Sequence, residues 1–109
     1  YDGTNIDWNG EVKMTAYVIY HQTEIFDSEV YRREYQGPAR ASIEKFGGRQ
    51  LVGGEFEVVE GEWLGPRIVV HEFPDMNTLK RWYNSDEFKP LIKLRQSVAK
   101  GNLIIADGF

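Results

Sequence analysis

Three short segments of this chain are apolar on both faces of an extended strand, and this feature constrains the fold most. In residues 15–22 (TAYVIYHQ), Ile19 points to one side and Val18 to the other, and residues 67–73 and 102–106 repeat the pattern. A sheet with helices on one face and water on the other should alternate apolar and polar residues. The pattern therefore predicts a sheet that buries both faces.

Helical spacing follows the strands at residues 15–22 and 67–73. Apolar residues recur every three to four positions after Asp27 and again after Asp75, and both aspartates are suitable helix N-caps. Residues 49–52 form a short strand between them. The element order β-α-β-β-α-β predicts an α+β ferredoxin-like sandwich, with the strands at 15–22 and 67–73 as parallel neighbours in the centre.

Glycine and proline predict where these elements are interrupted. Gly37-Pro38 should break or kink the first helix, because proline lacks an N–H and disfavours a helical residue before it. Asn84-Ser85 should divide the second helical region, and Gly101 should end it. Residues 55–60 (EFEVVE) are expected to form a further extended piece.

The helices can cover one face of the sheet, so the other face needs a partner. The simplest partner is a second copy, which predicts a homodimer through the sheet face. The alternative is that residues 1–13 and the 54–66 loop cover it. We expect residues 14–109 to form a single domain and residues 1–13 an amino-terminal arm, either native or added ahead of a start at Met14.

Composition excludes several partners and chemistries. Thirteen basic against seventeen acidic residues give a net charge of −4, which disfavours nucleic acid and anionic membranes as partners. The absence of cysteine excludes disulfides, thiolate catalysis and zinc–thiolate sites. Residues 48–53 have the glycine spacing of a phosphate loop but lack its Lys-Ser/Thr, and no dinucleotide fingerprint exists, so no cofactor is expected. A cytoplasmic protein is the default.

The two histidines are the first candidates for catalysis. His21 and His71 each lie near the end of a strand. If their rings share one face of the sheet, they could transfer protons or hold a metal with a carboxylate. The alternative is that each is hydrogen-bonded or solvated at its strand end.

Aromatic residues and arginines form a second set of candidates. Tyrosines at helical positions could offer hydroxyls to a planar ligand between helices and sheet, or could simply be core residues. Arg49 could bind a carboxylate of a ligand, or pair with a glutamate such as Glu72, which is itself either structural or a general base. The catalytic candidates are His21, His71, Tyr35 and Tyr83, and the ligand-binding candidates are Tyr31, Arg49, Glu72, Trp82 and Arg95.

Six short stretches resemble a known bacterial family. They are residues 16–20, 45–49, 59–63, 67–74, 82–85 and 94–95. In this order they resemble the family called domain of unknown function 1330, of the dimeric α+β barrel superfamily. The resemblance implies two ferredoxin-like subunits packed sheet against sheet. Superfamily relatives include cofactor-free monooxygenases, haem-degrading enzymes, isomerases and non-catalytic binders, but no catalytic set of theirs is matched residue by residue.

Two classes of function follow from these observations. The first is a homodimer that binds a small, partly apolar molecule between helices and sheet, with or without cofactor-independent turnover. The second is a non-catalytic dimeric module that acts by binding or assembly alone. A haem or metal oxygenase is a third and weaker reading. Fold class alone does not decide among them.

Overall fold

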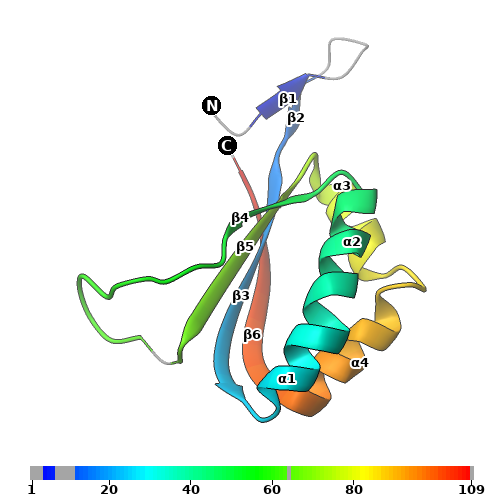
Figure 1. Ribbon diagram of the computed structural model, residues 1–109. Coiled ribbons are helices and arrows are strands. Elements are labelled where there is room, and N and C mark those ends of the chain that lie inside the picture. The colour runs from blue at the N-terminus through cyan, green and yellow to red at the C-terminus, as the bar shows by residue number, and fades with distance from the viewer. Residues whose placement is uncertain (1–3, 7–11, 64, 109) are drawn as a thin grey trace.

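The computed structural model describes residues 4–6, 12–63 and 65–108. Its strands and helices are those drawn in Figure 1, with η1 denoting a π-helical turn. In chain order they are β1 (Thr4–Ile6), β2 (Val12–Met14), β3 (Ala16–Ile25), α1 (Ser28–Val30), η1 (Tyr31–Gln36), α2 (Gly37–Lys45), β4 (Arg49–Val52), β5 (Arg67–Phe73), α3 (Met76–Tyr83), α4 (Lys89–Val98) and β6 (Ala99–Asp107).

The main sheet has four strands in the order β4-β5-β3-β6, which confirms the ferredoxin-like prediction. All neighbours in it are antiparallel. The expectation that the two central strands are parallel was therefore wrong. In the β3–β5 pair, Val18 lies opposite His71, and His21 lies opposite Ile68. This register decides below which side chains share a face.

The first helical region runs without a break from Ser28 to Lys45, against the expected interruption at Gly37-Pro38. Gly37 has helical dihedrals, and the six residues before it form a π-helical turn. A π-helical turn bonds residue i to residue i+5, so the backbone before Pro38 does not depend on its missing N–H. The predicted caps are confirmed: Asp27 accepts from the Val30 N–H, and Asp75 accepts from the Thr78 N–H.

The last strand and the long loop also differ from expectation. β6 begins directly after α4, at Ala99, so Gly101 lies within the strand and does not end the helix. An added Cβ at Gly101 would lie 2.5 Å from Cε1 of Tyr20, so glycine is required where β6 passes this ring. Residues 55–60 form no strand; they belong to a loop that projects from the sheet between β4 and β5 (Figure 1).

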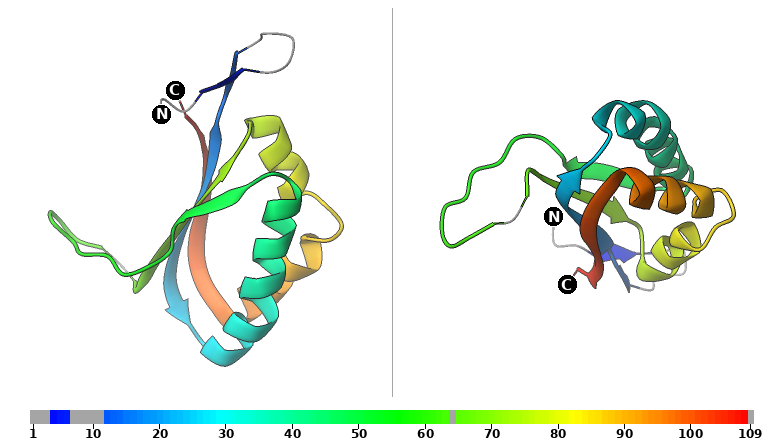
Figure 2. Two further views of the ribbon diagram at one scale, coloured as in Figure 1. Left: turned by 45° about the horizontal axis from the view of Figure 1, so that its top comes forward. Right: turned by 90° about the horizontal axis from the view of Figure 1, so that it is seen from below.

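The helices cover one face of the sheet only, as two orientations show (Figure 2). Under them lies a core whose most buried large side chains are Phe73, Leu79 and Phe88. The opposite face carries Ile19, Val70 and other partly exposed apolar residues, with Ile104 57% exposed. The two-sided apolar pattern predicted from the strands is therefore confirmed, and one face is open in the single chain.

Thr4–Ile6 and Val12–Met14 pair as a separate antiparallel hairpin, and Val12–Met14 leads into the start of β3 (Figure 1). This hairpin makes the described part of the predicted arm a two-stranded element apart from the main sheet. No helix in the described ranges is long and apolar enough to span a bilayer.

Candidate functional site

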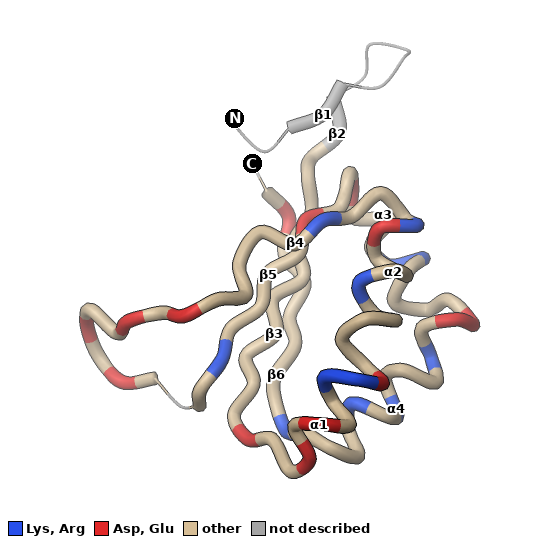
Figure 3. Tube along the Cα trace, in the orientation of Figure 1, with Lys and Arg blue, Asp and Glu red and all other residues tan. Residues whose placement is uncertain are grey.

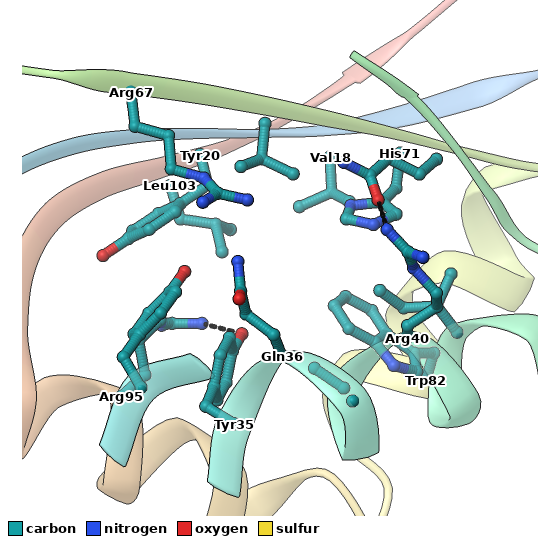
Figure 4. A pocket seen from close by; sticks show the side chains of 16 residues that line it. Val18, Tyr20, Tyr35, Gln36, Arg40, Arg67, His71, Trp82, Arg95 and Leu103 are labelled. Carbon is teal, nitrogen blue, oxygen red and sulfur yellow. Dashed lines mark hydrogen bonds between the residues drawn. The ribbon is translucent and has the colours of Figure 1, made fainter. Parts of the chain in front are cut away.

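A cavity of about 230 Å³ lies between the helices and the covered face of the sheet (Figure 4). Its floor comes from β3, β5 and β6, with Gln50 of β4 at one edge. Its roof comes from η1 and α2, with Trp82 of α3 and Arg95 of α4 closing the sides. Polar groups gather at two ends of this space, and apolar side chains line the stretch between them.

One end is built around Arg95, which is 5% exposed although it carries a positive charge. Its Nη1 donates to the Tyr35 hydroxyl at 3.1 Å, and its guanidinium lies 5.1 Å from the centre of the Tyr20 ring. Burial raises the pKa of both phenols, although Arg95 acts in the opposite direction. The phenols are therefore neutral hydroxyls at neutral pH.

Arg67 reaches the same end of the cavity from the start of β5 (Figure 4). With its amide oxygen facing the guanidinium, Gln36 accepts from Nη1 at 3.0 Å and from Nη2 at 2.8 Å. The Nε of Arg67 is buried and has no hydrogen-bond partner among the described residues. This leaves a charge-bearing donor in the cavity wall without an acceptor.

The other end holds His71, with Gln50 opposite it on β4 and Arg40 nearby on α2. Arg40 donates to the side-chain oxygen of Gln50. Burial, with the charges of Arg40 and Arg67 acting in the same direction, lowers the pKa of His71 to about 4. His71 is thus a neutral imidazole at neutral pH, able to accept a proton or share a hydrogen bond.

The apolar wall between these ends is held by internal contacts. Nε1 of Trp82 donates to the Ser42 hydroxyl at 3.0 Å, which fixes the indole beneath α2. The rings of Tyr31 and Tyr35 lie 5.1 Å apart, and burial raises the pKa of Tyr31 well above its usual value. These aromatic side chains give a flat apolar group a surface to pack against in this part of the cavity.

The cavity is cationic although the protein is acidic. Three arginines line it, at positions 40, 67 and 95, and no Asp or Glu is among its described lining residues. The loop between β4 and β5 carries Glu55, Glu57, Glu60 and Glu62, and it projects away from the helices (Figure 3). The site is therefore suited to an anion more than the net charge of −4 suggests.

The structure brings together five of the nine residues predicted from the sequence. These five line the cavity: Tyr31, Tyr35, His71, Trp82 and Arg95. Tyr83 lies outside it, against Trp82 with ring centres 6.0 Å apart, and borders a shallow hollow near β6.

Arg49, Glu72 and His21 lie on the open face of the sheet. Nε of Arg49 donates to Oε1 of Glu72 at 2.9 Å, which is the ion pair left open as the alternative to a ligand contact. The ring of His21 lies 4.3 Å from that of Trp63 on the long loop.

The proposed histidine pair is therefore wrong in its geometry. His71 shares its face with Val18, while His21 shares the opposite face with Ile68. The two imidazoles are separated by the sheet and cannot transfer a proton to each other or bind one metal. No group of three or more potential metal ligands occurs in the part of the chain that the structure describes.

The candidate set chosen from the sequence leaves out polar residues that complete the cavity, although simple signals for them were present. Arg67 alternates with Val69 and His71, which places all three on one face of β5. Arg40 follows Gln36 by one helical turn, on the side of the helix that carries Ile43. Tyr20 alternates with the buried Val18 and could have been found in the same way.

The family described as domain of unknown function (DUF1330) matches residues 15–109, which include every residue of this cavity. The chain belongs to this family. A comparison of this DUF1330 protein with functionally curated proteins finds no match.

Solved structures share the fold of this DUF1330 chain at low sequence identity. A protein of unknown function from Rhodopseudomonas palustris is 16% identical, with a TM-score of 0.70 over 87% of this chain and 82% of that chain. SnoaB from Streptomyces nogalater, a cofactor-independent oxygenase, is 9% identical, with a TM-score of 0.63 over 84% and 90%. A dimeric protein of unknown function with a ferredoxin-like fold from Bacteroides fragilis is 13% identical, with a TM-score of 0.51 over 85% and 95%. At these identities the likeness establishes the fold alone.

Proposed function

We propose that the protein binds a small, partly apolar molecule in the cavity between its helices and its sheet. The observation that carries this proposal is a preformed space with apolar walls and a few converging polar groups, the usual construction of a small-molecule site. An apolar cavity of about 150 Å³ binds benzene. A cavity of about 230 Å³ therefore has room for one ring with a polar substituent.

We infer that the functional unit is a homodimer joined through the open face of the sheet. Ile104 at 57% and Val59 at 86% exposure leave apolar surface in water on this side and on the adjoining loop. A second copy would remove that surface from water without disturbing the cavity on the other face. The dimeric Bacteroides fragilis protein, which shares the fold, is consistent with this arrangement.

Cofactor-independent turnover is the second candidate, and His71 is the observation that favours it. Its imidazole is unprotonated at neutral pH and lines the cavity, so it can take part in proton transfer from a bound carbon acid, with the lowered pKa making it a weak base. SnoaB, which shares the fold, is a cofactor-independent oxygenase, so this scaffold supports chemistry without a bound group. The alternative is a non-catalytic binding protein, in which His71 and the other polar groups of the cavity only orient the ligand.

Binding is tested by titrating one-ring probes, such as benzyl alcohol and benzoate, into isotope-labelled protein. The indole N–H signal of Trp82 should shift, because this side chain lines the cavity. Leu103→Trp should abolish the shift by filling the space from β6. Ile105→Trp on the same face of β6 is the matched control, since Ile105 lies outside the cavity. Equal shifts in both variants would reject the cavity as the site.

Turnover is tested with phenylacetone in heavy water. A catalytic base should accelerate deuterium incorporation next to the carbonyl, and His71→Gln should remove the acceleration while the probe still binds. Incorporation at the background rate in the wild type would leave binding as the function.

A further inference from the structure

We propose that the ligand of this cavity carries a carboxylate on a flat, one-ring apolar body, with the carboxylate held by Arg67. This inference deepens the proposed function and rests on it. It follows from three features of the described residues: an excess of positive charge in the cavity wall, an unused donor on Arg67, and a space that fits one substituted ring.

The first feature is uncompensated charge. Charged side chains that leave water are normally paired, because desolvation of an unpaired ion is costly. Arg95 is almost fully buried, and its hydrogen bond goes to the neutral Tyr35 hydroxyl. No carboxylate within the described chain forms an ion pair with Arg40, Arg67 or Arg95. A bound anion would supply the missing negative charge.

The second feature is the geometry of Arg67. Gln36 occupies one N–H of each terminal nitrogen, while the buried Nε has no acceptor among the described residues. Nε–H and the neighbouring Nη–H of a guanidinium point in parallel, and this fork matches the two oxygens of a carboxylate. Gln36 thus holds Arg67 at its terminal nitrogens, and the Nε donor stays unused by any described residue although other atoms cover it from solvent.

The tyrosines do not supply the missing charge. Tyr20 and Tyr35 lie against Arg95, but burial raises the pKa of both phenols, so they remain neutral near pH 7. As neutral hydroxyls they are donors, which again favours an acceptor on the ligand. Every polar group at this end of the cavity therefore favours the same kind of ligand group.

The third feature is size and shape. A space of about 230 Å³ matches one aromatic ring with a carboxylate and a further small substituent. The body of such a ligand would extend from Arg67 past Val18 and Leu103 toward Trp82 and His71 (Figure 4). Carboxylates with a single aromatic ring are the chemical class that matches both the positive charge and the volume of the cavity.

The experiment compares benzoate with benzamide, which has nearly the same shape and no charge. Chemical shifts of Trp82 Nε1–H and Arg67 Nε–H report occupancy in the wild type, Arg67→Met, Arg67→Lys and Arg33→Met. Arg33 is an exposed arginine on η1 and is the matched control. Thermal melting of each variant establishes that it is folded.

We expect benzoate to bind at least about tenfold more tightly than benzamide, as charge-assisted pairing requires. Arg67→Met should bring benzoate down to the affinity of benzamide, Arg67→Lys should recover part of the loss, and Arg33→Met should change nothing. If Arg67→Met does not fold, two other measurements test the inference: the loss of benzoate affinity in Arg67→Lys and the shift of the Arg67 Nε–H signal in the wild type.

Three results would overturn the inference. Equal binding of benzoate and benzamide, with Trp82 shifted by both, would reject the carboxylate and leave the proposed function intact. Inorganic phosphate binding as tightly as benzoate at Arg67 would mean an adventitious anion site only. No shift of Trp82 or Arg67 with either probe at about 10 mM, where even millimolar affinities are visible, would reject both the carboxylate and the proposed binding function.

Discussion

The arginines of this protein have different partners on the two sides of the sheet. Arg67 lies on the covered face of β5, where the Gln36 amide holds it beside the cavity that Arg95 lines from α4. Arg49 lies on the open face and is held by Glu72. The difference is set by strand alternation and register, because a shift of one residue moves a side chain to the other face.

His71 should make the stability of the fold depend on pH. Its pKa is about 4 in the folded chain and near 6.5 when unfolded, so between these values the unfolded chain binds more protons. Its contribution therefore lowers the free energy of unfolding as the pH falls from about 6.5 to about 4, and stays constant below that. For a half-buried group we expect a loss of about 2 kcal/mol.

Urea unfolding of the wild type and of His71→Gln, at several pH values between 4 and 7, measures this effect. The variant lacks the titrating group. Its free energy of unfolding should therefore rise relative to that of the wild type as the pH falls. Parallel curves for the two proteins would show that His71 is not buried as described.

Arg49→Ala should affect stability and leave ligand binding unchanged. The side chain of Arg49 is largely exposed, but that of Glu72 is 11% exposed and loses one partner. We expect a fall of about 1 kcal/mol in the free energy of unfolding. Benzoate affinity should match the wild type, because Arg49 lies across the sheet from the cavity. A weakened benzoate affinity with an unchanged melting temperature would instead assign Arg49 to the ligand.

At the scale of elements, β6 shapes the cavity through one glycine. Gly101 passes the Tyr20 ring so closely that Gly101→Ala would bring its Cβ to 2.5 Å from Cε1 and 2.7 Å from the His21 carbonyl oxygen. The ring must move, and with it the contact to Arg95. We expect a loss of about 2 kcal/mol in stability.

The control for this substitution is Gly54→Ala. A Cβ at Gly54 would have no atom within 4 Å, and its stability should stay within about 0.5 kcal/mol of the wild type. Both variants can be compared by thermal unfolding. Similar melting temperatures for the two would contradict the close passage of β6 over Tyr20.

The elements also show what local sequence signals can and cannot predict. Strand alternation and the caps at Asp27 and Asp75 were predictable, because they depend on neighbours within a few residues. Pro38 was misjudged, since the π-helical turn before it offers an alternative hydrogen-bond pattern that propensity rules do not include. Gly101 was misjudged because its role depends on Tyr20, which is distant in sequence.

The site could be predicted only in part, for a related physical reason. Strand alternation correctly predicted on which side of its own strand each of His21 and His71 lies. The relation between the two strands depends on direction and register, and these are fixed by pairing across about fifty residues of chain. The cavity lies where η1 and α2 are separated from the sheet. That separation depends on how several elements pack, so it cannot be predicted from any single segment.

At the scale of the whole molecule, the two faces of the sheet have different surroundings. The helix-covered face encloses the cavity, and the open face carries the apolar surface that the proposed second copy would cover. The radius of gyration of 14.8 Å exceeds the roughly 13 Å of a compact chain of this length, because the hairpin and the long loop project from the body.

Ile104→Lys should therefore dissociate the proposed dimer while keeping the subunit folded. Ile104 is 57% exposed in the single chain, so a lysine there meets water in the monomer but an apolar surface in the dimer. Ile105→Lys, on the helix side of the same strand, is the control and should leave the assembly unchanged. Sedimentation of both variants distinguishes the two faces directly.

The most direct test of this division is the native mass of the purified wild-type protein, compared with its denatured mass. The account predicts a particle near twice 12.6 kDa that carries additional mass of a small molecule, or gains it on addition of benzoate, and loses it on denaturation. A particle of 12.6 kDa that takes up no benzoate would contradict both the shared sheet face and the ligand cavity.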